Sequence, residues 1–600
     1  MSILEIPRIM FGGKISWDPI VTNNYNTLYD ESTAWTILQR QNSVEEFRKN
    51  SQSKEWIENG NWNPQGTHRS RFYNSYVNGT NIGEGVSDDD PFVGSPVNFV
   101  GMLVDCEPYG SLSSQLFFDG LTLGIEGGCR ISLPRSNRVT ARYINFFRLP
   151  RNIYSFAASV ASVTWQTSFP KESLSIDAFD SAALQALKQA LKADDVLGLT
   201  VRFNAYSTHY YGAEESSEID ALEQAFIEEL KDGGFQPNPA TSEIVGVVGL
   251  WRKGEPAHEP GDRAMLAAIP LSSPPPPEFV GSASARVSDN ALVIDFSNSI
   301  SETDLAMTKQ DLGPLIFVAV DVQTSKKAEI ATIVYDQYNR EAYLSGSGII
   351  SIPLEQSLVD AARNGELLMQ GQDGTVYLKE QALRAIPCDP NLYINEGETT
   401  HTDVLVLDKG QPAEEGVSIA MILADDSIFE SDQQVTNGKG IVTFDIAGAT
   451  GQVQGYLFDT SGSLDFPGSI DTQTNTYMYI RTLPLDGALD EIEKPTWDQV
   501  YTLCLSNWNA MAPCMDNWLD LKDEKQVMEY ASMLKSLTDP ENFERFQFMP
   551  VTRDMTMGQR NLLYRFLDGD SPASAIRLKT EAKVKKSASL RKLSRQMRSR

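Results

Sequence analysis

Two short frames in the sequence carry residue types that could hold a metal or transfer protons: Glu255-x-x-His258 and Glu398-x-x-His401. Such a frame supplies two ligands of a di-iron centre when both residues project from one face of a helix in a four-helix bundle. Pro256 and Pro260 disfavour a helix around the first frame, and Gly397 and strand-like neighbours disfavour one around the second. We therefore interpret both frames as parts of loops or strands and predict no metal site and no cofactor.

The sequence lacks the frames of nucleophilic, nucleotide-dependent and zinc-peptidase chemistry. It contains no G-x-S-x-G elbow, no Walker loop, no G-x-G-x-x-G after a strand and no H-E-x-x-H. Asp295 and Asp321 lie near the ends of predicted strands and are candidate acid–base carboxylates, but nothing in the sequence pairs them. We expect both to be solvated and assign no catalytic residue.

The cysteines predict no disulfide framework. Their number is odd, their spacing is wide and no two of them form C-x-x-C. We interpret all five as small apolar residues of the interior, namely Cys106, Cys129, Cys388, Cys504 and Cys514.

The C-terminal tail differs in charge from the rest of the chain. Residues 577–600 contain ten Lys or Arg and one acid, whereas the first 576 residues contain 41 basic and 79 acidic residues. Leucines at partial helical spacing favour a basic amphipathic segment, and the alternative is a solvated tail. We expect a protein partner to bind the cations of this tail, namely Lys583, Lys585, Lys586, Arg591, Lys592, Arg595 and Arg598.

Length and composition predict a soluble protein of several domains, because single cores stop growing near ~250 to 300 residues. No run of ~18 apolar residues could cross a bilayer, so we expect no membrane span. The N-terminal residues lack the basic and apolar regions of a signal peptide. We expect a cytoplasmic protein, with export by a dedicated machine as the alternative. The net charge of −29 disfavours nucleic-acid binding by the body of the protein.

The clearest strand signals lie between Asp194 and Arg263. Residues 197–203 alternate apolar and polar side chains, which predicts a strand with one wet face. Residues 244–251 are apolar on both faces, which predicts a covered strand, and Gly246 and Gly249 leave room for a neighbouring backbone. Two short amphipathic helices are predicted at 180–192, capped by Asp180, and at 217–233.

The remaining pattern predicts a mainly β multi-domain protein, built of sheets and β-sandwiches with a few inserted helices and a C-terminal α-helical segment. Gly and Asn turns between short strands are typical of an immunoglobulin-like sandwich. Four consecutive prolines mark a linker near residue 275. The expected units are a β-rich N-terminal domain (1–270), a second β domain (279–385), an immunoglobulin-like sandwich (386–485), a helical segment (496–570) and the tail (571–600).

Several stretches, in order along the chain, resemble one family. They are Met1–Arg8 with Phe11 and Gly12, Asp195–Val201, Val245–Arg252 with Gly254 and Glu255, Val334–Tyr338 with Ile352–Leu354, and Met549–Arg553. Together they resemble the iminophenyl-pyruvate dimer synthases of violacein biosynthesis and the chromopyrrolate synthases of rebeccamycin biosynthesis, over roughly the whole chain. These signatures are structural in character and not catalytic.

The resemblance implies a bacterial protein of secondary metabolism. In that family the metal-dependent coupling belongs to a C-terminal ferritin-like half, and this sequence ends about where that half would begin. No histidine follows His401, so no family active-site residue has a match here. We expect a non-catalytic binding or assembly module. One alternative is an enzyme subunit in aromatic amino-acid-derived, bisindole-like biosynthesis that binds an aromatic small molecule, and another is an interaction or cargo protein addressed by its tail.

Overall fold

The structure is a computed structural model, and it describes residues 3–17, 29–36, 69–105, 113–134, 138–145, 162–209, 240–269, 279–304, 306–424, 431–449, 451–462, 470–511 and 519–569. Several predicted features lie outside the described residues. They are the helix at 217–233, the proline-rich linker, Cys106, Cys514 and the basic tail with Lys583, Lys585, Lys586, Arg591, Lys592, Arg595 and Arg598.

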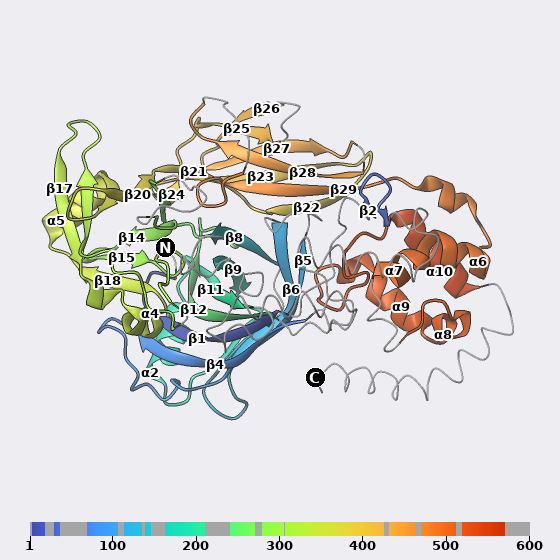
Figure 1. Ribbon diagram of the computed structural model, residues 1–600, viewed down its shortest axis with the longest axis horizontal. Helices are drawn as coiled ribbons and strands as arrows, with labels where there is room; N and C mark the ends of the chain where they lie inside the picture. The colour runs from blue at the N-terminus through green and yellow to red at the C-terminus, as the bar shows by residue number, and fades with distance from the viewer. Residues whose placement is uncertain are drawn as a thin grey trace.

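Ten strands of the N-terminal region form one antiparallel sheet, and eight of them close into a barrel (Figure 1). The order around the barrel is β5, β4, β1, β12, β11, β9, β8 and β6, and β6 closes it by pairing with both β5 and β8. β7 and β10 extend the sheet from β6. The strands are β1 (Arg8–Trp17), β4 (Ser70–Asn81), β5 (Val97–Asp105), β6 (Ser114–Gly124), β7 (Arg130–Pro134), β8 (Val139–Asn145), β9 (Ser162–Pro170), β10 (Ser175–Asp177), β11 (Val196–His209) and β12 (Ala240–Arg252).

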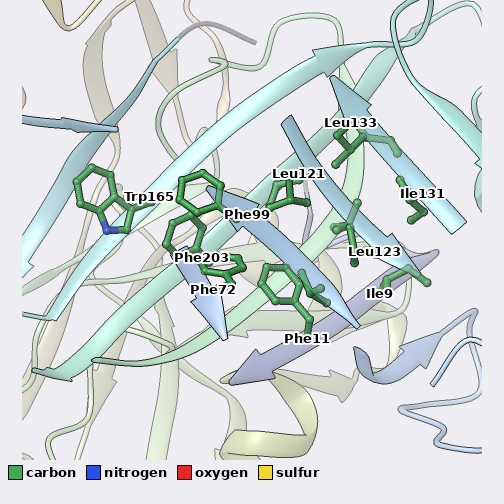
Figure 2. Packing of buried hydrophobic residues seen from close by; sticks show 14 of the residues in the cluster. Ile9, Phe11, Phe72, Phe99, Leu121, Leu123, Ile131, Leu133, Trp165 and Phe203 are labelled. Atoms are coloured by element: carbon green, nitrogen blue, oxygen red, sulfur yellow. The ribbon is translucent and has the colours of Figure 1, made fainter. Parts of the chain in front are cut away.

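Aromatic side chains fill the barrel interior (Figure 2). The ring centroids of Phe72, Phe99 and Phe203 lie 5.0 to 6.3 Å apart, and Trp165 stacks on Phe203 at 6.4 Å. Side chains alternate between the two faces of a strand, and eight strands enclose a space that such side chains can fill. The barrel therefore has a packed apolar core.

β12 lies between β1 and β11 in the barrel wall, which confirms the predicted covered strand. Gly249 has the predicted backbone neighbour, because a Cβ at this position would lie 2.7 Å from the Cα of Ile3. For Gly246 the prediction is wrong. Its space is taken by the ring of Phe11, whose nearest carbon would lie 2.2 Å from a Cβ, so a side chain and not a backbone makes the close approach.

The short helix α2 (Ala182–Ala190) confirms the helix predicted at 180–192. Its predicted cap is wrong, because the side chain of Ser181, and not that of Asp180, accepts the hydrogen bond from the backbone N–H of Leu184. Ser181 has the extended backbone conformation that an N-cap residue needs.

A second, eight-stranded antiparallel sheet follows, in the order β17-β16-β19-β20-β13-β14-β15-β18 (Figure 1, yellow-green). β13 lies in its middle, so the chain enters this sheet before residue 270. The elements are β13 (Arg263–Ala267), β14 (Ala283–Val287), β15 (Ala291–Asp295), β16 (Leu315–Val320), β17 (Lys327–Ile333), α4 (Arg340–Gly346), β18 (Ile349–Pro353), α5 (Gln356–Asn364), β19 (Glu366–Gln370) and β20 (Val376–Gln381).

Two smaller sheets share one apolar core and form a β-sandwich above the barrel in Figure 1. One contains β21, β23, β24 and β27, and the other has the order β22-β29-β28-β25-β26, with β22 and β29 parallel. The strands are β21 (Leu383–Pro387), β22 (Asn391–Asn395), β23 (Thr399–Asp408), β24 (Gln411–Pro412), β25 (Ser418–Leu423), β26 (Ser431–Val435), β27 (Ile441–Ala447), β28 (Gln452–Asp459) and β29 (Tyr477–Leu483).

The helical segment lies at the right of Figure 1, and a short N-terminal hairpin packs against it. Its helices are α6 (Trp497–Val500), a π-helical turn (Tyr501–Leu505), α7 (Ser506–Met511), α8 (Glu524–Glu529), α9 (Ala531–Thr538) and α10 (Met557–Asp568). The hairpin of β2 (Tyr29–Asp30) and β3 (Trp35–Thr36) packs into the same core through Tyr29 and Ala34. The phenol of Tyr29 donates to Asp554 at 2.8 Å.

The observed architecture confirms the predicted fold class, a mainly β protein of several sheets with helices near the C-terminal end of the described chain. Within the described ranges, none of the helices combines the length and the apolar character that a membrane crossing requires.

Candidate functional site

The outer faces of β9 and β11 are polar and buried, which overturns the prediction of a wet face. Opposite residues on these strands pair in register: Thr200 with Ser168, Arg202 with Gln166 and Asn204 with Thr164. Their side chains hydrogen-bond across the strands, as the 2.7 Å contact between the hydroxyls of Ser168 and Thr200 illustrates. The alternation predicted the polar face correctly, but the second sheet and the loop before it cover that face.

Arg202 is the centre of this buried face. Its guanidinium donates to Asp295 of β15 at 2.8 Å and to Gln166 of β9 at 2.9 Å, and it approaches Asp262 at 3.5 Å. The prediction that Asp295 is solvated is wrong, because this carboxylate is buried against Arg202 and also accepts from the backbone of Ser297. Arg202 therefore joins the barrel to the eight-stranded sheet.

Glu259 is the centre of a second buried group, where the barrel meets the β-sandwich. Its carboxylate accepts from Arg384 of β21 at 2.5 Å and from the phenol of Tyr143 at 3.1 Å. Arg142 of β8 forms an ion pair with the same carboxylate at 3.2 Å. Burial raises the pKa of Tyr143 well above its usual range, so the phenol remains a donor at neutral pH.

A polar cavity of about 20 Å³ lies beside Arg202 at the junction of these groups. Asp295, Ser284, Ser297 and Thr164 are among its lining residues. This volume is about that of one water molecule, which needs two to four polar partners. The cavity is therefore too small for an organic substrate.

The loop between β12 and β13 carries the first of the two Glu-x-x-His frames. Burial raises the pKa of Glu255 to about 9, and one carboxylate oxygen accepts from the backbone N–H of Arg252 at 2.7 Å. Burial also lowers the pKa of His258, and the cations of Arg138 and Arg142 act in the same direction. At neutral pH the loop thus holds a protonated carboxyl group and a neutral imidazole.

We expect Glu255→Gln to remove a pH dependence of stability. The pKa of Glu255 is raised in the fold from 4.5 to about 9, so the unfolded chain loses this proton first as pH rises. The wild-type free energy of unfolding should therefore fall as pH rises from 5 to 8, because the folded state binds up to one proton more than the unfolded state. The free energy of unfolding of the variant should increase relative to that of the wild type over this range. Urea midpoints at pH 5, 6, 7 and 8 test this, and parallel curves for the two proteins would contradict it.

The second frame lies in and beside β23, as predicted for a strand. Glu398 accepts from the backbone N–H of Asn395 at 2.9 Å, and the His401 side chain is exposed. Throughout the part of the chain that the structure describes, no three His, Cys, Asp or Glu side chains come together as a metal site would require.

Asp321 is solvated, as predicted, and the backbone N–H groups of Gln323 and Thr324 lower the pKa of its carboxyl. Among the cysteines, Cys504 is buried as predicted and Cys129 is partly buried. For Cys388 the prediction is wrong, because this residue follows β21 where the chain leaves the sheet and is exposed.

The residues that build the junction were not selected from the sequence as site residues. Glu259, Asp262 and Arg384 carry no local signal, because their partners are far away along the chain. The available signal was the alternation on β9 and β11, which places only polar residues at 164, 166 and 168 and at 200, 202 and 204. The arrangement can hold charges in place across a junction, and the described groups show no paired nucleophile and base.

A search of curated proteins found a relative of known activity. The chain is 24% identical over 442 residues to the 2-imino-3-(indol-3-yl)propanoate dimerase of Chromobacterium violaceum, a match that covers 69% of this chain and 38% of the relative. This confirms the similarity to the violacein-type dimer synthases. The chain thus spans less than two fifths of the length of the relative it matches.

Comparison with family models gave no match. Solved structures gave weak likenesses only. A Salmonella alpha-2-macroglobulin reacted with methylamine is 11% identical in sequence, with a TM-score of 0.14. The match covers 70% of this chain and 22% of the macroglobulin. The native Escherichia coli alpha-2-macroglobulin is 10% identical in sequence, also with a TM-score of 0.14. The match covers 81% of this chain and 27% of that macroglobulin. Scores this low support no inference about the fold.

Proposed function

We propose that this chain is a non-catalytic binding or assembly module related to the violacein-type dimer synthases. The observation that supports it is that buried charges at the junctions are paired across unit boundaries. Arg202 meets Asp295 between the barrel and the second sheet, and Arg384 meets Glu259 between the sandwich and the loop after the barrel. A buried ion pair is weak evidence for added stability, and we infer that these pairs fix the relative positions of the units.

An enzyme subunit for an aromatic, bisindole-like product is the second candidate, because the printed activity of the relative is the dimerisation of an indolyl imino acid. The assay uses 2-imino-3-(indol-3-yl)propanoate, generated in place from tryptophan by an amino-acid oxidase. Serum albumin in place of this chain is the control. If the chain is a non-catalytic module, the rate of product formation and the distribution of products should be the same as with serum albumin. Faster dimer formation with this chain would reject the module and support the enzyme subunit.

We propose that the basic tail binds a protein partner. The third candidate function is therefore that of an interaction or cargo protein whose tail is recognised by this partner. We expect a chain ended at Ile576 to keep its unfolding midpoint, because single exposed ion pairs contribute only ~0 to 1 kcal/mol. It should lose a specific association that weakens as salt rises, since exposed charges are screened over ~8 to 10 Å. Pull-downs with the full chain and the 1–576 chain, at low and high salt, test this. Identical partner lists would contradict it.

A further inference from the structure

Strand β26 forms an edge of the β-sandwich (Figure 1). It is the last strand in the order β22-β29-β28-β25-β26, and among the described residues it pairs only with β25. All five of its residues, Ser431–Val435, are exposed. Backbone N–H and C=O groups along such an edge can bind a further strand.

The neighbouring hydrogen bonds show which backbone groups of β26 point away from the sheet. The backbone N–H of Ala424 donates to the carbonyl of Gly455, so the even-numbered residues of β25 direct their backbone groups toward β28. On the other side, the backbone N–H of Thr436 donates to the carbonyl of Val417, which places the odd-numbered residues of β25 toward β26. The even-numbered residues of β25 lie opposite the odd-numbered residues of β26. The outward backbone groups of β26 are therefore those of Ser431, Gln433 and Val435.

The two edge strands of the eight-stranded sheet carry features that block such pairing. β17 begins with Lys327 and has a bulge opposite Phe317 and Val318. β18 ends with Pro353. Lysine, proline and bulges are common protections of an edge strand. β26 contains neither lysine nor proline, and its register with β25 is regular.

We propose that β26 pairs with β26 of a second copy of this chain. An antiparallel, two-fold symmetric pairing centred on Gln433 directs the outward backbone groups of the two strands toward each other. It also sets Asp432 of each copy opposite Gln434 of the other. The Gln434 amide suits this carboxylate, since within one strand its Nε2 donates to Asp432 at 3.3 Å.

The side chains of β26 favour this register over its neighbours. A shift by two residues in either direction keeps the outward backbone groups facing each other but pairs only three of the five residues. One of these shifts also sets the two Asp432 side chains opposite each other, and like charges in that position destabilise a sheet. The proposed dimer uses a surface other than the tail, and it does not depend on whether the chain is an assembly module or an enzyme subunit.

Sedimentation velocity of the full chain tests the proposal over a range of about 1 to 100 µM, because a small interface is expected to have micromolar or weaker affinity. We expect the wild type to change from monomer to dimer with concentration. Gln434→Asp sets two carboxylates opposite each other at two places in the dimer, and we expect it to weaken dimerisation by about tenfold or more. Adding Asp432→Lys to Gln434→Asp replaces each repulsive pair by an attractive one, so dimerisation should return.

Gln411→Asp is the matched control, because it makes the same exchange at an exposed residue of β24, in the other sheet of the sandwich. It should dimerise as the wild type does. A wild type that stays monomeric, a Gln434→Asp variant that dimerises equally well, or a double variant that does not regain dimerisation would overturn the proposal.

Hydrogen exchange of the wild type gives a second measurement that needs no variant. The backbone amides of Gln433 and Val435 should exchange more slowly as the concentration rises over the same range, because pairing with a second copy gives them acceptors. Exchange in β26 that is independent of concentration would overturn the proposal, even if the chain dimerises through another surface.

Discussion

Replacing Arg202 by methionine is expected to lower the free energy of unfolding by about 3 to 5 kcal/mol, the range for breaking a buried ion pair from one side. The change leaves the carboxylate of Asp295 buried without its cation and removes the donor to Gln166. Methionine fills a similar volume, so the loss reports the charge and not a cavity. Urea unfolding followed by circular dichroism measures the effect.

Arg71→Met is the control for this variant. Arg71 lies on β4 of the same barrel, and its side chain is exposed. Surface substitutions usually change stability by less than about 0.5 kcal/mol. A similar small effect for Arg202→Met would show that the polar face of β11 does not hold the units together.

The second large effect is expected for Asp554→Ala, at about 3 to 5 kcal/mol. Asp554 is fully buried and accepts from the phenol of Tyr29 at 2.8 Å and from the indole of Trp508 at 3.0 Å. The hydroxyl of Thr552 donates to it at 2.5 Å. Alanine leaves three buried donors without an acceptor and breaks the link between the N-terminal hairpin and the helical segment.

Limited proteolysis of Asp554→Ala should show faster cleavage in the helical segment than in the barrel, because the hairpin supplies part of the helical core. Asp568→Ala is the control, since the Asp568 side chain is 71% exposed and its ion pair with Lys535 lies at the surface. We expect that control to behave as the wild type. Equal cleavage of the barrel and the helical segment in Asp554→Ala would contradict the linking role.

Much of the fold could be predicted from the sequence because side-chain alternation is a local property of strands. The alternating run at 197–203 predicted β11, and the apolar run at 244–251 predicted β12. Closure of the barrel could not be predicted, because it depends on the short β6–β8 pairing. The hairpin at 29–36 is a similar case, since its partners lie more than 400 residues away along the chain.

The candidate site was harder to predict, because alternation shows that a face is polar and not what covers it. The polar residues of β11 gave the same pattern as a solvated face, yet Arg202 is 3% exposed. Asp295 was misjudged for the same reason, since its partner lies 93 residues earlier in the sequence. The two Glu-x-x-His frames were placed correctly outside helices, because proline and glycine act locally.

The buried charges link the units of the chain, and a double-mutant cycle of Arg202 and Asp295 tests this most directly. The cycle compares urea unfolding of wild type, Arg202→Met, Asp295→Asn and the double variant. Direct contact across the junction predicts a coupling energy of at least ~2 kcal/mol, near the upper part of the range for contacting residues. Additive losses, with a coupling below ~0.5 kcal/mol, would contradict the assignment of this pair as a link between the barrel and the second sheet.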